Sequence, residues 1–399
     1  RAGSGRGPRA PGRLGGMPRS DGFVPPPYPH DRLAALRAVA EAAPGGLVDC
    51  SVGTPVDPMP EVAVEALVAA AASATGYPPS IGTPALREAA AAWVGRRFGV
   101  AVTPGDVIAC VGTKELVASL PFWLHRRDPS RDTVLYPAVS YPTYAMGAHL
   151  AGLRAVPVPV DDGWQLDLGR IGADDAGRAL VLWLNEPANP TGAVAGPERL
   201  EAAVAWARRR GVVVAGDECY AELTYDASGA PAAPATVLGS GLDGVLAVHS
   251  LSKRSNMAGL RAGFVAGDPD LVGYLGEVRK HAGMMVPAPV QAAAAAALRD
   301  DAHVEEQRRR YAERRALALP AFAAMGLEHD GGPATFYLWL RALVDGGWPL
   351  AERLAATGLL VAPGDLYGPD GVDHVRVSLT QPVDRLELAL DRLAGTPVL

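Results

Sequence analysis

Lysine is rare in this chain, and one lysine lies in an unusual setting. Of the 37 basic residues in the 399-residue sequence, only Lys114, Lys253 and Lys280 are lysines. Lys253 stands in the segment VHSLSKRSNMAGLR, between serine hydroxyls and ahead of Arg261. A lysine that loses its proton can form an imine with a carbonyl group, which an arginine cannot do. The segment therefore indicates covalent carbonyl chemistry at Lys253.

Polar residues directly follow four short apolar runs, and their types are complementary. The runs are Val107–Val111, Leu180–Leu184, Val212–Ala215 and Val245–Val248. The residues that follow them are, in the same order, Gly112-Thr113-Lys114-Glu115, Asn185 to Gly192 with Asn189 inside it, Gly216-Asp217-Glu218-Cys219-Tyr220, and His249-Ser250-Leu251-Ser252-Lys253. Ligands of an open parallel sheet bind outside the carboxyl ends of its strands. We therefore expect an amine, a carboxylate, a phenol, an amide and a helix N-terminus to face one crevice.

A phosphate suits the helix that we expect to begin after Gly112. Unpaired backbone N–H groups and the helix dipole favour an anion at a helix N-terminus. Further donors to a phosphate are Thr113, Ser250, Ser252 and Arg261. Asp217 could pair with a pyridinium nitrogen, the partner that makes pyridoxal phosphate an electron sink.

Each of these features also has a plain structural interpretation. Gly112-Thr113 could be an ordinary helix cap, Asp217 a cap of the following segment, Tyr220 a core residue, and Lys253 a surface lysine. The stretch from Asn189 to Gly192 is by itself a plain turn. No dinucleotide or nucleoside-triphosphate fingerprint is present. The combination of four strand ends in one chain favours the functional interpretation.

The elements that position these residues predict an α/β fold. Helical periodicity at Glu61–Ala74 and Pro84–Phe98 precedes the apolar runs, which also include Thr133–Tyr136 and Phe264–Ala266. Such runs, separated by helices, imply a mostly parallel sheet covered by helices on both faces. Later elements are expected at Val290–Met325 (helical), at Phe336–Leu340, Leu359–Val361 and Val375–Leu379 (strands), and at Val383–Ala394 (helix).

This pattern predicts a large domain and a smaller α+β domain. We expect a flexible extension at residues 1–20, a segment at 21–59 that joins the small domain, the large domain at 60–285 and the small domain at 286–399. The net charge of -6 and the pI near 5.8 argue against a nucleic-acid surface. Three widely spaced cysteines fit a reducing, cytoplasmic setting and no metal site, and no apolar run is long enough to span a membrane.

Three motifs resemble a known family. NEPANPTG, DECY and SLSKRSNMAGLRAGF, in this order and spacing, resemble fold-type I pyridoxal-phosphate enzymes of the class I/II aminotransferase family. The resemblance covers nearly the whole chain from about residue 30. It implies pyridoxal 5'-phosphate as cofactor, a large cofactor-binding domain, and transfer of an amino group between an amino acid and a 2-oxo acid by a ping-pong mechanism.

The resemblance also implies roles for individual residues. Lys253 would bind the cofactor covalently and move the substrate's α-proton, and Asp217 would hold the pyridine nitrogen. Further cofactor contacts would come from Tyr220 and Asn189 to the phenolic oxygen, and from Gly112, Thr113, Ser250 and Arg261 to the phosphate. Arg376 in HVRVSL would clamp the substrate α-carboxylate, and Gly53 in SVGTPVDP would lie in the turn that closes over the substrate.

Two tyrosines are assigned through looser matches. Tyr77 resembles the tyrosine that reaches the neighbouring subunit's phosphate, which implies a homodimer with shared sites. Tyr141 in SYPTY is a candidate for the aromatic residue stacked on the cofactor ring, with a core tyrosine as the alternative. The distal substrate pocket is expected around Phe23–Tyr28, Gly283–Val286 and Tyr367.

Within the family, GTKELVASLP and HSLSKRSNMAGLRAGFVAGD are most similar to actinobacterial N-succinyldiaminopimelate aminotransferases of lysine biosynthesis. The alternatives are aspartate, kynurenine or aromatic aminotransferases and a carbon–sulfur β-lyase on the same fold. A regulatory domain without catalysis is disfavoured because the catalytic set is intact. Expected partners are small amino-acid and oxo-acid substrates, without nucleic acid or membrane.

Overall fold

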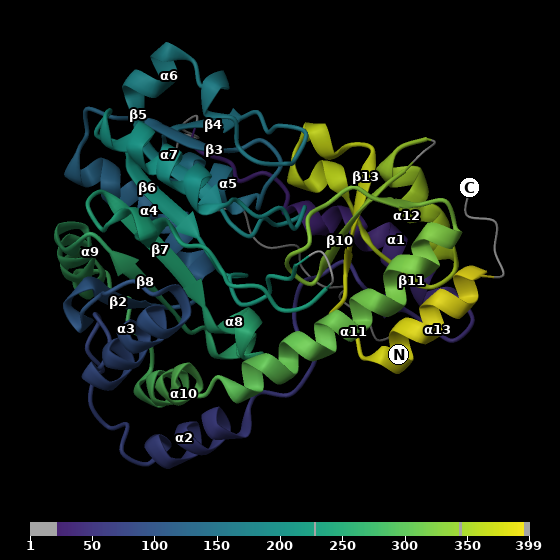
Figure 1. Cartoon of the computed structure of the whole chain (residues 1–399), viewed down its shortest axis with the longest axis horizontal. Helices are drawn as coiled ribbons and strands as arrows, with labels where there is room; N and C mark the ends of the chain where they lie inside the picture. Colours follow the sequence, from purple (N-terminus) through teal and green to yellow (C-terminus); the bar gives the residue numbers. More distant parts are fainter. Residues whose placement is uncertain (1–21, 227–228, 343–344, 395–399) are drawn as a thin grey trace, which may run out of the picture.

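The chain folds around a large sheet with a smaller sheet beside it, as a computed structural model shows (Figure 1). The structure describes residues 22–226, 229–342 and 345–394. The extension expected at residues 1–20 lies outside the described residues. Along the described ranges, no helix has the length and apolar character needed to cross a membrane.

The large sheet has seven strands, of which all but one run parallel. Their spatial order is β2 (Val107–Cys110), β8 (Gly263–Gly267), β7 (Val245–Ser250), β6 (Val213–Asp217), β5 (Ala179–Asn185), β3 (Thr133–Pro137) and β4 (Arg154–Val158). β8 pairs antiparallel with both β2 and β7, and β3 to β7 pair in parallel. The predicted α/β class with a mostly parallel sheet is confirmed.

Helices cover both faces of the large sheet because its strands are apolar on both sides. Val107 and Ala109 of β2 belong to one buried cluster, whereas Ile108 and Cys110 belong to another. The first cluster includes residues of α3 (Pro84–Phe98), α7 (Pro197–Arg208) and α10 (Ala288–Arg299), and the second includes residues of α4 (Thr113–Arg127), α5 (Thr143–Leu150) and α9 (Pro269–His281). This double cover leaves the strand ends as the place where polar loops collect.

The smaller part is built on a four-stranded antiparallel sheet. Its order is β12 (Ala362–Pro363), β13 (His374–Ser378), β10 (Tyr337–Arg341) and β9 (Glu328–His329), and a separate parallel pair joins β1 (Val48–Asp49) to β11 (Leu359–Leu360). Helices α1 (Ala34–Ala42), α12 (Gly347–Ala356) and α13 (Val383–Ala394) pack here. The long helix α11 (Ala302–Ala324) runs from the end of α10 to this sheet (Figure 1).

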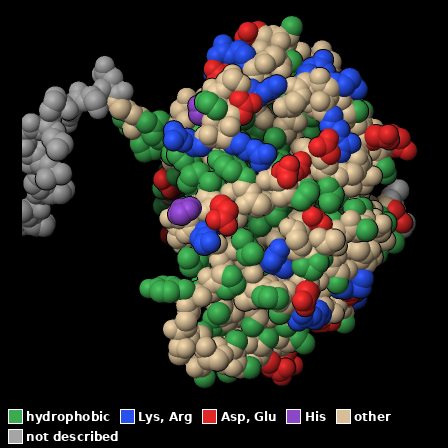
Figure 2. All heavy atoms as spheres, turned by 90° about the vertical axis from the view of Figure 1, so that its left-hand side faces the viewer, with side chains coloured by type: hydrophobic (Ala, Val, Ile, Leu, Met, Phe, Trp, Pro, Cys, Tyr) green, Lys and Arg blue, Asp and Glu red, His purple; other side chains and the backbone are tan. Residues whose placement is uncertain are grey.

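Shorter elements complete the fold. They are α2 (Glu61–Ala71), α6 (Ala173–Arg178), α8 (Leu251–Arg254) and the 3-10 turns η1 (Pro29–Leu33), η2 (Pro104–Asp106), η3 (Leu168–Arg170), η4 (Val237–Ser240), η5 (Ala258–Leu260), η6 (Gly364–Tyr367) and η7 (Pro369–Gly371). Figure 2 shows the outer face of the large part, where basic and acidic side chains are interspersed with apolar ones.

Two expectations about the elements were wrong. Strand β4 was missed, because its sequence RAVPV contains a proline, which strands tolerate at a sheet edge, where β4 lies. The helix expected over Val290–Met325 is two helices, because the backbone at Asp300 is extended, with φ -105° and ψ 110°, which ends α10 before α11 begins at Ala302. The strand expected at Leu359–Val361 is present as β11, which ends at Leu360, and the next strand, β12, lies beyond the expected range and joins a different sheet.

Candidate active site

A cavity of about 330 Å³ lies at the carboxyl ends of the large-sheet strands and reaches the small part. Its lining includes most of the residues singled out from the sequence: Gly53, Thr113, Tyr141, Asn189, Asp217, Tyr220, Ser250, Lys253, Arg261 and Arg376. Gly112 lies directly behind this lining, against Arg261, and Tyr77 lies outside it. The parallel strand ends therefore bring the four polar loops to one place, as expected from the sheet geometry.

Lys253 is partly buried, in a position that favours its neutral form. Its ammonium donates a hydrogen bond to the backbone carbonyl of Gly53 and lies 5.7 Å from the centre of the Phe336 ring. Burial lowers the pKa of Lys253, and the positive charges of Arg376 and Arg261 lower it further. A lysine with a lowered pKa is more readily deprotonated, which is the form that attacks a carbonyl.

Asp217 is a buried carboxylate at the end of β6. One oxygen accepts a hydrogen bond from the Tyr144 hydroxyl at 2.7 Å, and the other accepts from Cys219 N at 3.3 Å. Burial raises the pKa of Asp217, although these hydrogen bonds and the charge of Lys253 oppose the shift. Within the described ranges no ion pair within 4.0 Å reaches this carboxylate. A cationic ring nitrogen would supply the missing counter-charge.

Gly112, Arg261 and the first turn of α4 lie together in an arrangement that suits an anion. Gly112 has φ +72°, and a Cβ atom there would lie 2.1 Å from Arg261 Nη2, so only glycine lets the guanidinium approach the helix start. Arg261 itself has a left-handed backbone with φ +56°, a strain that is common at functional sites. Ser250 Oγ accepts from Ser252 N at 3.1 Å and keeps its own proton to donate. Thr113 opens the helix beside them.

Arg376 and Asn189 are connected across the cavity wall. Arg376 Nη1 donates to Asn189 Oδ1 at 2.8 Å, and Nη2 donates to the Ser51 carbonyl at 2.7 Å. The guanidinium lies 4.0 Å from the centre of the Tyr337 ring. Because Oδ1 of Asn189 is an acceptor here, its amide nitrogen is left to donate to a ligand. Arg376 uses two of its five N–H groups in these contacts, and the geometry of a guanidinium suits a carboxylate at the others.

Tyr337 is a site residue that the sequence interpretation did not single out. Its hydroxyl lies 2.9 Å from the Tyr220 hydroxyl, and a Cβ atom at Gly53 would lie 1.8 Å from it. Gly53 is therefore required for the turn to pass over Tyr337. Tyr141 lines the cavity and packs edge-on against Tyr144, with 5.9 Å between ring centres. Tyr144 was inside the quoted SYPTY motif, which was the available signal for it.

The outer part of the cavity is aromatic and carries one lysine. Lys114 Nζ donates to the Tyr28 hydroxyl at 3.1 Å and lies 4.6 Å from the centre of that ring. His30 also lines the wall, and burial together with the charges of Arg376 and Lys114 lowers its pKa to about 4. Tyr28 and Tyr367 line the cavity as expected, whereas Gly283–Val286 does not.

Comparison with known proteins identifies the family of this chain. The model of the family "Aminotransferase class I and II" matches residues 46–393. The chain belongs to this family. The aminotransferases of the family use pyridoxal 5'-phosphate, and the residues around the cavity fit it: the anion site suits its phosphate, and Asp217 suits its ring nitrogen.

Individual relatives of this aminotransferase cover almost its whole length. The "4-dedimethylamino-4-oxo-anhydrotetracycline transaminase OxyQ" of Streptomyces rimosus is 48% identical over 368 residues, which are 92% of this chain and 99% of that protein. The "Probable aminotransferase Rv1178" of Mycobacterium tuberculosis is 47% identical over 387 residues, 96% of this chain and 88% of that protein. A solved "probable N-succinyldiaminopimelate aminotransferase" from Thermus thermophilus is 30% identical, with a TM-score of 0.82 over 92% of this chain and 99% of that one.

Proposed function

We propose that this aminotransferase exchanges an amino group between an amino acid and a 2-oxo acid by a ping-pong mechanism with Lys253 as its central residue. The observation that carries the proposal is the convergence of a partly buried amine, a buried carboxylate and a set of hydrogen-bond donors suited to an anion on one cavity. When bound, pyridoxal phosphate supplies a protonated ring that withdraws electrons from the substrate α-carbon.

The cofactor would be held by residues from four strand ends. Asp217 would stabilise the charge on the ring nitrogen, and Tyr220 with the Asn189 amide would donate to the phenolic oxygen. Gly112, Thr113, Ser250 and Arg261 would bind the phosphate, and Tyr141 would stack on the ring. Preorganised groups of this kind stabilise charge without reorganisation during the reaction.

The substrate would be oriented by Arg376 and closed in by the turn at Gly53. Arg376 would bind the α-carboxylate, a bidentate task suited to guanidinium. With the carboxylate fixed, Lys253 would take the proton from the substrate α-carbon and hold it for return to the product. The lowered pKa of Lys253 favours its action as a base, and its burial excludes water from the transfer.

We further propose N-succinyl-LL-2,6-diaminopimelate and 2-oxoglutarate as the substrate pair, in lysine biosynthesis. The support is Lys114 at the outer cavity wall, where it could bind a carboxylate distant from the reacting carbon. The similar Thermus thermophilus protein carries the corresponding name. A ring substrate is the second candidate, because Tyr28, Tyr337 and Tyr367 line the same cavity and the relative from Streptomyces rimosus is named for a tetracycline derivative.

We also propose a homodimer with shared sites. Tyr77 is 97% exposed in the isolated chain, a position from which it could reach a partner's phosphate site. The preceding helix α2 exposes Val62, Val64 and Val68, so the segment before Tyr77 also offers apolar side chains to a second copy. A separate proposal concerns the cellular compartment. Cys50, Cys110 and Cys219 are free thiols, which supports a location in the reducing cytoplasm.

Half-reaction spectra with a panel of amino donors test the substrate proposal. Each donor is mixed with the cofactor-loaded enzyme without an oxo acid, and conversion of the cofactor to its amine form is followed by absorbance. We expect rapid conversion by glutamate and N-succinyl-diaminopimelate, and little by aspartate, phenylalanine or unmodified diaminopimelate. Faster conversion by phenylalanine would favour an aromatic substrate. Release of pyruvate and ammonia from cystathionine without an oxo acid would identify a β-lyase instead.

A further inference from the structure

Lys253 is carried by a helix that is too short to be stable by itself. α8 has four residues, and a single helical turn needs tertiary contacts to persist. The position of the Lys253 amine therefore depends on the side chains that fasten this turn to the rest of the domain. The next residue, Arg254, is buried outside the cavity that Lys253 lines.

Arg254 fastens α8 to two long helices. Its Nη1 atom donates to the Ala297 carbonyl of α10 at 3.0 Å. Its guanidinium carbon lies 5.5 Å from the centre of the Trp93 ring of α3. The rotation of α8 about its axis is thereby tied to the packing of α3 and α10.

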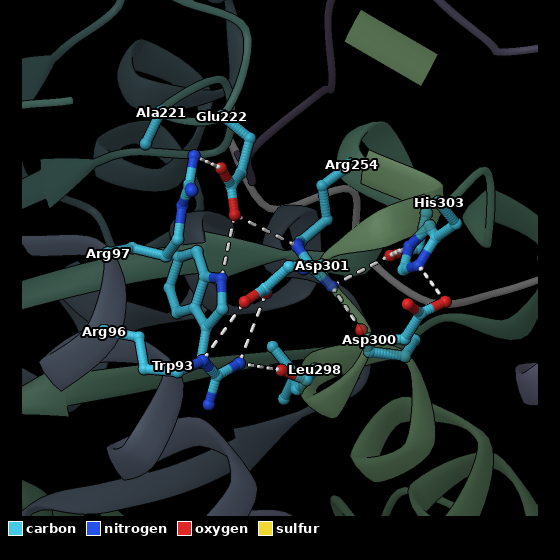
Figure 3. Close-up of polar contacts among 12 residues, drawn as sticks. Trp93, Arg96, Arg97, Ala221, Glu222, Arg254, Leu298, Asp300, Asp301 and His303 are labelled. Atoms are coloured by element: carbon cyan, nitrogen blue, oxygen red, sulfur yellow. Dashed lines mark hydrogen bonds and ion pairs between the residues drawn. The ribbon is translucent and has the colours of Figure 1, made fainter. Parts of the chain in front are cut away.

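The counter-ion of Arg254 comes from the loop that follows Asp217 and carries Tyr220. Arg254 Nε lies 3.6 Å from Oε1 of Glu222, and both side chains are 4% exposed (Figure 3). The same Glu222 oxygen accepts from Trp93 Nε1 at 2.8 Å, and the other pairs with Arg97 Nη2 at 2.7 Å. This buried cluster joins the end of β6 to the end of β7.

A second set of hydrogen bonds holds Ser255. An arginine N–H can only donate, so Ser255 Oγ accepts from Arg254 Nη1 at 3.0 Å and directs its own proton to His303 Nε2 at 2.9 Å. His303 Nδ1 then donates to the Asp300 carboxylate at 3.0 Å, as a neutral imidazole does. Burial and the charge of Arg254 lower the pKa of His303, which agrees with this arrangement.

We propose that Arg254, with Glu222 as its counter-ion, is a positioning residue that keeps the Lys253 amine aligned with the cofactor carbonyl and the substrate α-proton. The inference rests on the role proposed above for Lys253. A buried ion pair adds little net stability compared with apolar packing, but it restricts the groups that carry it to one arrangement. Here the pair links α8, which carries Lys253, to the segment that follows Asp217 at the end of β6, and so fixes the two residues relative to each other.

Four variants of the cofactor-loaded enzyme test the inference: Arg254→Met, Arg254→Lys, Glu222→Gln and the control Arg96→Met. Arg96 lies on α3, the helix that also carries Trp93. Like Arg254, it contacts a carboxylate and a backbone carbonyl, here those of Asp301 and Leu298, and it does not contact Arg254 or Glu222 (Figure 3). The measurements are kcat and KM for the amino donor, the pH titration of the absorbance band of the lysine-bound cofactor, and thermal unfolding of the cofactor-free chain.

Arg254→Met is expected to lower kcat about 10- to 100-fold with little change in KM, because a displacement of about 1 Å at a reacting group has this effect. The titration midpoint of the band should shift by about half a unit or more. Glu222→Gln should act in the same direction, Arg254→Lys should recover part of the loss, and Arg96→Met should change neither kcat nor the titration.

Two results would overturn the inference. One is a folded Arg254→Met enzyme with lower thermal stability but unchanged kcat and band titration, since the cluster would then act on the fold alone. The other is an equal kinetic loss in Arg96→Met. If the absorbance band of the bound cofactor persisted in Lys253→Ala, the role of Lys253 itself would be refuted. Failure of the proposed function is therefore distinguishable from failure of the inference about Arg254.

Discussion

Replacing Arg376 by lysine tests how the substrate carboxylate is held. The guanidinium is 3% exposed and already donates to Asn189 and to the Ser51 carbonyl. A lysine ammonium retains the charge but has one nitrogen, so it cannot bind both oxygens of a carboxylate and keep these two contacts. Arg376→Lys therefore removes geometry while it preserves charge.

The size of the effect follows from the hydrogen bonds that are lost. A hydrogen bond to a charged group contributes about 1.5–3 kcal/mol, so loss of one of two bonds to the carboxylate should lower kcat/KM about 10- to 150-fold. Cofactor affinity should fall less, because Asn189 remains beside the cavity with only its acceptor contact altered. The loss should be similar for every amino acid, since all carry the α-carboxylate.

Steady-state kinetics with two amino donors, together with a cofactor titration, measures these quantities. The matched control is Arg341→Lys, on the neighbouring strand β10 at an exposed position outside the cavity. Its kinetics should equal those of the wild type. The reasoning about Arg376 is refuted if Arg376→Lys keeps kcat/KM within about twofold of the wild type, or if the whole loss disappears at saturating cofactor.

Three other changes have expected outcomes. Burial raises the pKa of Glu218 from 4.5 to about 8. Between these pH values the folded chain keeps a proton that the unfolded chain has released. The free energy of unfolding therefore falls as the pH rises. Glu218→Gln should flatten this decline in urea unfolding between about pH 6 and 8, and an unchanged slope contradicts it. Lys114→Met should raise KM about 10-fold for N-succinyl-diaminopimelate through loss of one charged contact, and an equal rise for phenylalanine would exclude recognition of a distal carboxylate. Tyr77→Ala should weaken cofactor binding in equilibrium dialysis without changing dimerisation in sedimentation, and unaltered affinity would remove Tyr77 from the phosphate site.

The sequence was sufficient to predict the positions of those site residues that lie at the ends of parallel strands. Asp217 and Lys253 lie at the ends of short apolar runs, and parallel strands bring such ends to one edge of a sheet. Arg261 and Gly112 were found because a helix start and a cation suit a phosphate. Their contact, where a Cβ atom would overlap the guanidinium, depends on the positive φ of both residues and needed the structure.

Other parts depend on contacts between distant segments. The Tyr337 hydroxyl meets Tyr220 only because the small antiparallel sheet packs against the loop that follows β6, and no local pattern specifies that approach. The Trp93 and Glu222 side chains are joined across 129 residues of sequence. Before the fold is known, each of them is an unremarkable residue in a helix or a loop.

The most direct test of the account compares cofactor binding and turnover in Lys253→Ala and Lys114→Ala. Both variants remove one of the chain's three lysines, and both residues line the same cavity. The account predicts that Lys253→Ala loses the absorbance band of the covalently bound cofactor and all transamination, whereas Lys114→Ala keeps the band and transaminates glutamate. Retention of both properties in Lys253→Ala, with their loss in Lys114→Ala, would contradict it.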